Sequence, residues 1–211
     1  MNMVKPVVLF VLAVSFTAIA STVYADDQDM PDMPANSSYV VVKGGQYSPS
    51  GTYDISNFNG NTTSHLDAKT GFSGEIALGQ YSNPDLALEL GIGYFESKGS
   101  PAPEPGSTRL KAVPIVVTAK GFTQLGRLKT YFEFGVGAYL TELDASGNLG
   151  SFSSRTKTTY GLHAGAGFNI DISDKIFIGL EGRYLWARAV YSGQPIKLDG
   201  LMTAIDLGYR Y

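Results

Sequence analysis

The chain has 211 residues, no cysteine and a formal net charge of −3 at pH 7. These values exclude disulfides, thiolate metal sites and a lipid-modified N-terminal cysteine, and they leave no basic excess of the kind that binds nucleic acid. Glycine (25 residues), tyrosine (13) and phenylalanine (11) are abundant. Glycine and aromatic residues in alternating runs indicate β-structure.

Residues 1–25 predict a cleaved secretory signal peptide. Lys5 is their only charge, an apolar run covers residues 7–20, and Val23 and Ala25 are small residues before a cleavage site. A single membrane anchor is the alternative, but the run is shorter than the ~20 residues that span a bilayer. Export without cysteine favours a bacterial envelope protein. Residues 26–37 contain four aspartates and two prolines and predict a disordered acidic periplasmic lead-in.

Eight runs of the remaining chain place apolar side chains at every second position, as strands do, and none has a helical period. In the first run both faces carry valine, so its facing stays open. The second and third alternate cleanly, with Glu75 and Glu89 opposite leucine and isoleucine. The fourth is irregular because Pro114 precedes a continuous Ile-Val-Val stretch. The predicted strands cover residues 38–47, 71–81, 85–96, 108–122, 129–141, 158–171, 175–187 and 201–211.

Short and long connections alternate along these strands. The second and third, the fourth and fifth, and the sixth and seventh strands are joined by short turns, whereas the other joins cover residues 48–70, 97–107, 142–157 and 190–199. Short turns at one end and long loops at the other are typical of a barrel that crosses a membrane. The predicted fold of residues 38–211 is therefore all-β, an eight-stranded antiparallel up-and-down transmembrane β-barrel.

The two faces of the predicted strands differ in chemistry. One face combines many glycines with charged residues, which suits the narrow interior of an eight-stranded barrel. The other face is aliphatic in its middle and aromatic near its ends, which suits hydrocarbon between two headgroup layers. The predicted polar network of the lumen, structural in role, comprises Glu75, Glu89, Glu133, His163, Glu181, Arg183, Asp206 and Arg210.

The pattern as a whole resembles the small OmpA-type and opacity-type eight-stranded outer-membrane β-barrels. The resemblance covers residues 38–211 and rests on the rhythm of strands and loops, on the glycine-rich stretches FEFGVGAYL and LHAGAGFNI, and on the terminal LGYRY. It implies that the C-terminus carries the signal read by the barrel-assembly machinery. Leu207, Tyr209 and Tyr211 match that signal, although the family ends more often in phenylalanine.

Neither histidine predicts an active site. His163 is expected inside the lumen in a hydrogen-bond network. The outer-membrane lipid A deacylases, also eight-stranded, use a His and a Ser two residues apart, and here Gly165 stands at the position of that Ser. His65 lies in a long polar loop. The sequence predicts no catalytic, cofactor-binding or metal-binding residue.

The function predicted from the sequence is that of an integral outer-membrane barrel, exported by its signal peptide, with a structural or surface-interaction role in its long loops and no catalysis. A narrow porin-like channel for small solutes is the alternative. A lipid-modifying enzyme and a soluble lipid-binding barrel are further alternatives. The expected partners are outer-membrane lipid and lipopolysaccharide, the assembly machinery during biogenesis, and a surface ligand of the loops; nucleic acid is not expected.

Overall fold

The computed structural model describes residues 37–51, 53–56, 63–66, 68–99, 101–102, 106–125, 128–147, 150–153, 156–191 and 194–211. The predicted signal peptide and all but the last residue of the predicted lead-in lie outside this part of the chain. Within it, no helix is long and apolar enough to span a membrane.

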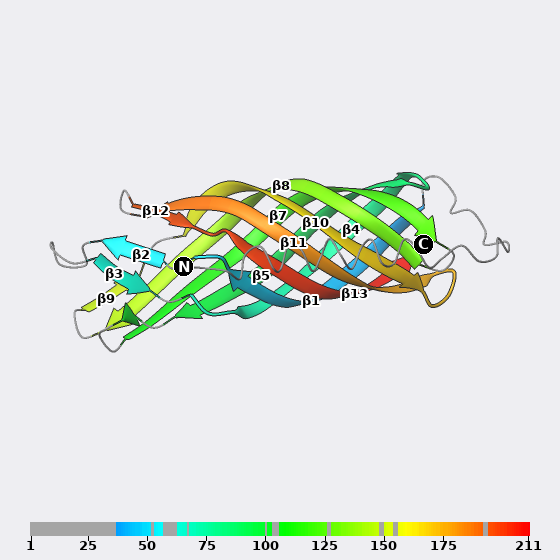
Figure 1. The fold of residues 1–211 in the computed structure, drawn as a ribbon. Helices are drawn as coiled ribbons and strands as arrows, with labels where there is room; N and C mark the ends of the chain where they lie inside the picture. Colours follow the sequence, from blue (N-terminus) through cyan, green and yellow to red (C-terminus); the bar gives the residue numbers. More distant parts are fainter. Residues whose placement is uncertain are drawn as a thin grey trace. The chain divides into compact units, whose positions relative to one another are not determined.

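Eight strands form a closed antiparallel barrel, as predicted (Figure 1). Each pairs with the next along the chain, β8 pairs with β10, and the first strand pairs with the last, so the sheet has no free edge. Closure leaves the backbone hydrogen bonds satisfied within the sheet, which a membrane requires. The barrel strands are β1 (Ser38–Pro49), β4 (Gly71–Asn83), β5 (Leu86–Gly99), β7 (Gly106–Leu125), β8 (Leu128–Gly147), β10 (Lys157–Asp171), β11 (Ile176–Tyr191) and β13 (Gly200–Arg210).

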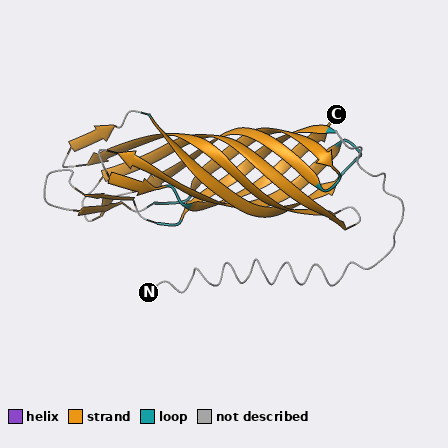
Figure 2. Ribbon diagram, turned by 90° about the horizontal axis from the view of Figure 1, so that it is seen from above, coloured by secondary structure: helices purple, strands orange, loops and turns teal. Residues whose placement is uncertain are grey.

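The long connections contain strands of their own, which the sequence analysis did not predict. A separate small sheet has the order β2–β3–β6, while β9 pairs with β8 and β12 pairs with β11. Figure 1 labels β2, β3, β9 and β12 at the end of the barrel away from the C-terminus, and Figure 2 shows short strands at that end in a second view. Strands β7 and β8 reach 20 residues each because they continue past the predicted boundaries. The short strands are β2 (Tyr53–Ser56), β3 (Thr63–Leu66), β6 (Pro101–Ala102), β9 (Gly150–Ser153) and β12 (Gln194–Lys197).

Outward-facing side chains of the barrel strands are large, apolar and exposed. Leu88 is 54% exposed, Phe132 63% and Ile205 67%. Side chains one position away, such as Glu89 and Glu133, are buried. So many exposed aliphatic and aromatic groups on one continuous surface suit contact with lipid rather than with water. The outside of the barrel is therefore apolar and its buried charged residues lie within, as the two faces predicted.

Pro114 lies within β7 and faces the lumen. The pairing of β5 with β7 passes from Ile92↔Ile115 to Phe95↔Ala112, and the two intervening residue pairs are missing from the ladder. On its other side Pro114 stays in register with Tyr139 of β8. The proline thus interrupts one ladder where it cannot donate a hydrogen bond and leaves the strand intact.

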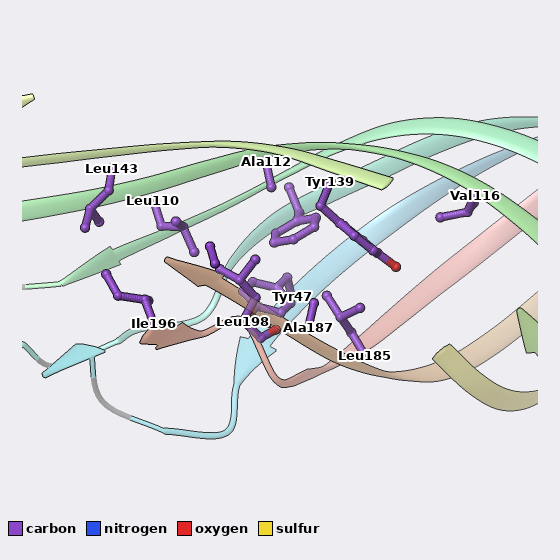
Figure 3. Packing of buried hydrophobic residues seen from close by; sticks show 12 residues of the cluster. Tyr47, Leu110, Ala112, Val116, Tyr139, Leu143, Leu185, Ala187, Ile196 and Leu198 are labelled. Carbon is purple, nitrogen blue, oxygen red and sulfur yellow. Dashed lines mark hydrogen bonds between the residues drawn. The ribbon is translucent and has the colours of Figure 1, made fainter. Parts of the chain in front are cut away.

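The lumen is filled in three layers. Near the short turns, rings and small side chains form an inner cluster of Tyr39, Val41, Ala77, Tyr81, Ala87, Phe122, Tyr131 and Phe177. Charged residues occupy the middle. Toward the long loops an outer cluster packs Tyr47, Phe95, Leu110, Ala112, Val116, Tyr139, Leu143, Leu185, Ala187, Ala189, Ile196 and Leu198, most of which are labelled in Figure 3.

Candidate functional site: the lumen and the outer rim

Three cations in the middle layer each contact three carboxylates. Lys43 lies within 3.1 Å of Glu75, Glu89 and Glu181. Lys120 contacts Glu89, Glu133 and Glu181 at 2.9 to 3.6 Å. Arg183 contacts Glu75, Glu133 and Glu181 at 2.6 to 2.9 Å. We call these seven residues the central charge network; six strands contribute to it.

Glu181 is the one carboxylate of the network that contacts all three cations. Its Oε2 accepts hydrogen bonds from Lys43 at 3.0 Å, Lys120 at 3.1 Å and the Tyr131 hydroxyl at 3.1 Å. Its Oε1 accepts from Arg183 at 2.6 Å. Charges this deeply buried are tolerable only with such complete pairing.

The sequence analysis missed two of the three cations, Lys43 and Lys120. Lys43 was on the strand whose facing stayed open, and Lys120 was on the strand made irregular by Pro114. Alternation places Lys43 on the same face as Val41 and Gly45, and Lys120 on the same face as Pro114, but in neither strand does the sequence alone say which face is inside.

His163 and Asp206 lie inside the barrel but outside the network. His163 is fully buried, and its Nε2 shares a 2.8 Å hydrogen bond with the Thr118 hydroxyl. Asp206 accepts a 3.3 Å hydrogen bond from Tyr131 and has no ion pair with any described residue. A small cavity of about 30 Å³ lies beside His163, Glu75 and Arg183.

Arg210 belongs to a different cluster, near the short turns. It contacts Asp171 at 2.6 Å, and Lys129 contacts the other oxygen of the same carboxylate at 2.9 Å. The Arg210 guanidinium also lies 4.6 Å from the centre of the Phe177 ring. The structure thus brings Glu75, Glu89, Glu133, Glu181 and Arg183 together in ion pairs. Asp206 and His163 border this network without an ion pair to it, and Arg210 lies in the separate cluster.

The predicted C-terminal signal faces outward. Leu207, Tyr209 and Tyr211 are 57%, 44% and 68% exposed, on the lipid-facing side of β13 and its end. The loop histidine, His65, lies in β3, where side chains are outside the described part of the structure.

At the end of the barrel that carries the long loops, the outward face of β5 changes from apolar residues to charged ones after Tyr94. Glu96 accepts hydrogen bonds from Arg109 of β7 and from Tyr94, and Lys98 lies 3.3 Å away. Glu96 stands above the lipid-facing residues, and the hydrogen bonds from Arg109 and Tyr94 hold its pKa at about 2. It is therefore an anion near neutral pH.

A family model described as "Outer membrane protein beta-barrel domain" matches residues 10–211. The chain belongs to this family. It is accordingly an outer-membrane protein, and its eight strands are the transmembrane part of that barrel. No curated protein matches the chain.

Two solved outer-membrane barrels have the same architecture. OprG of Pseudomonas aeruginosa is 13% identical, with a TM-score of 0.63 over 84% of this chain and 97% of its own. Ail, the attachment invasion locus protein of Yersinia pestis, is 16% identical, with a TM-score of 0.51 over 85% of this chain and 100% of its own. Likeness at these identities shows a shared fold.

Proposed function

We propose that this outer-membrane barrel is a surface protein, which anchors its long extracellular loops and the short strands within them for contact with a partner outside the cell. The observation that carries the proposal is the filled lumen. Two clusters of buried apolar side chains close the barrel on either side of the central charge network. A barrel packed in this way serves as a rigid support, and its binding surface lies in the loops.

The narrow channel is the second candidate, and the buried charges favour it. The ion pairs of the central charge network argue against a channel. Each cation of the network contacts three carboxylates, so no cation of the network is left free to bind a passing ion. We expect the purified, refolded barrel to give no steady conductance steps in a planar bilayer at neutral pH. Steady steps from protein that runs as the closed, heat-modifiable form would favour the channel instead.

Catalysis is not part of the proposal. The His163 imidazole is buried, hydrogen-bonded to Thr118, and on the lumen side of β10. A lipid substrate would approach from the opposite face of that strand, where the neighbouring side chains are Leu162 and Ala164. No described group of three His, Asp or Glu residues could hold a metal ion.

The loop role has a direct test. Replacing residues 57–62 with a glycine-serine linker of equal length alters the first long loop and leaves every barrel strand unchanged. We expect cells that carry this variant to lose most of the wild-type protein's adhesion to epithelial cells and extracellular matrix, with equal amounts of closed barrel in the outer membrane. The same exchange in the short turn at residues 126–127 is the matched control. Equal adhesion of both variants to every surface that the wild type binds would contradict the proposal.

A further inference from the structure

Beyond the closed, lipid-facing part of the barrel, strands β10 and β11 separate from each other at the end that carries the long loops. Their ladder ends at Gly161↔Ala187, although β10 begins four residues earlier, at Lys157, and β11 continues four residues further, to Tyr191. On their far sides both strands stay paired there, β10 with β8 and β11 with β12. We call residues 157–160 and 188–191 the fork. Among the described residues, no ladder joins its two sides.

The backbone groups that point into the fork follow from the alternation of hydrogen bonds along a strand. The Lys157 carbonyl accepts a 3.2 Å bond from a threonine of β8, so the N–H and C=O of Thr158 point the other way, into the fork. The Ala187 carbonyl accepts a 2.8 Å bond from the Leu198 N–H, on the β12 side. Val190 lies three positions further along β11, so its N–H and C=O also point into the fork. Thr158 and Val190 would form a hydrogen-bonded pair, and the β10–β11 ladder ends before reaching it.

Packing at the mouth of the lumen holds the two strands apart. The hairpin of β11 and β12 leans over the mouth, where Ala189 and Ile196 are 1% and 3% exposed and belong to the outer cluster with Leu143 (Figure 3). At the base of the fork, the Thr159 hydroxyl donates to the Arg188 carbonyl, which the next step of the ladder would otherwise use. The fork is therefore a built feature of the fold.

The open edge of β10 continues into β9. In the part of the chain that the structure describes, β9 pairs with β8 alone and stands last in the order of the sheet. Strand β8 keeps one register with β7 throughout, so the alternation along it is unbroken. That alternation turns the N–H groups of Ser151 and Ser153 away from β8, on the same side as that of Thr158. Backbone donors and acceptors therefore line this edge on both sides of residues 154–155.

A second copy of the chain in the same membrane could not supply the missing strand in antiparallel pairing. Two upright barrels carry β9 and β10 in the same direction, and antiparallel pairing, the more stable kind, needs opposite directions. An extended segment of another protein has no such constraint. Exposed sheet edges accept such segments as added strands, and the main-chain hydrogen bonds supply much of the affinity.

We propose that the open edge of β9 and β10 binds an extended segment of a protein outside the cell, which adds to the sheet as a further strand. The side chains beside the fork set the chemistry of that segment. Tyr160 and Val190 are 78% and 56% exposed, and Lys157 and Arg188 are exposed cations. The preferred segment therefore alternates apolar with acidic residues. The inference rests on the proposed function in one respect, that this end of the barrel faces outward.

The probe for the test is the fluorescently labelled heptapeptide TVTETVT with blocked ends. Its anisotropy is followed as refolded barrel in non-ionic detergent micelles is added. We expect saturable binding, and an affinity about tenfold or more lower in the double variant Ser151→Pro with Thr158→Pro. Each proline removes an N–H from the open edge and leaves the pairing with β8 in place. The matched control, Ser151→Ala with Thr158→Val, keeps both N–H groups and is expected to bind as the wild type does.

Three results would overturn the proposal. The first is equal affinity, or no binding, in the proline variant and its control, each shown by its heat-modifiable gel mobility to be closed. The second is equally tight binding of the same peptide methylated on its backbone nitrogens, which would assign binding to side chains alone. The third is equally tight binding of TVTKTVT, which would remove the preference for an acidic segment.

The outward orientation is measured separately with Asn59→Cys, a unique thiol in this cysteine-free chain, labelled on intact cells by a membrane-impermeant maleimide. Failure to label would count against the proposed function and leave the micelle result standing. Labelling without peptide binding would leave the proposed function standing and remove strand addition.

Discussion

Replacing Arg183 with methionine should lower the free energy of unfolding by about 3–5 kcal/mol, the usual cost of removing one partner from a buried ion pair. The guanidinium contacts Glu75, Glu133 and Glu181, and the residue is 4% exposed. Methionine fills much of the same space, so the loss reports charge rather than a cavity. The loss in free energy of unfolding is measured by urea unfolding of the refolded barrel in lipid vesicles, followed by Trp186 emission.

Asp206→Asn is the matched control for Arg183→Met. Asp206 is as deeply buried, at 1% exposed, but its only described hydrogen bond comes from the Tyr131 hydroxyl at 3.3 Å, and an asparagine oxygen can also accept it. We expect a change below about 1 kcal/mol. Arg210→Met should fall between the two, because Arg210 contacts a single carboxylate, that of Asp171. A loss for Arg183→Met no greater than that for Asp206→Asn would mean that the network adds nothing to stability.

Gly208→Ala is expected to destabilise the barrel by about 1–3 kcal/mol through overpacking. Gly208 lies opposite Phe177 in the register, and a Cβ added to it would overlap the Phe177 ring. That ring has little room to move, because Tyr39 packs edge-on against it at 5.8 Å and Arg210 lies over its face. Urea unfolding in vesicles measures the loss.

A double-mutant cycle separates the clash from the backbone effect. In a Phe177→Ala background the ring is gone, so adding Gly208→Ala should cost almost nothing. Gly44→Ala is the control on the lipid-facing side, where an added Cβ meets no heavy atom within 4 Å. It is expected to be neutral or to stabilise slightly, since glycine is unfavourable within a strand. Equal losses at positions 208 and 44 would contradict the account.

Strand alternation carried most of the fold prediction, because a period of two assigns each side chain to one face wherever the two faces differ in chemistry. Its failures have physical causes. Residues 38–47 carry valine on both faces, so the pattern could not orient Lys43. The short strands β2, β3, β6, β9 and β12 depend on backbone pairing within long polar connections, which leaves no hydrophobic signature.

The membership of the central charge network was harder to predict than its existence. The alternation of side chains along a strand assigns a residue to the lumen side, but it does not give the residue's height along the axis of the barrel. Arg210 and Glu181 share the lumen side, yet Arg210 lies near the short turns with Asp171. Height follows from the register between strands, and the sequence of a single chain does not reveal that register.

The central charge network also has a consequence for how the chain enters the membrane. Lys43 comes from the first barrel strand and Glu181 from the seventh, 138 residues later. A hairpin or half-barrel would carry some of these charges without their partners, and an unpaired charge in hydrocarbon is costly. We therefore expect insertion of partial structures to be disfavoured until most of the strands are paired. The residues that fill the finished lumen thus also couple the stability of each strand to closure of the whole sheet.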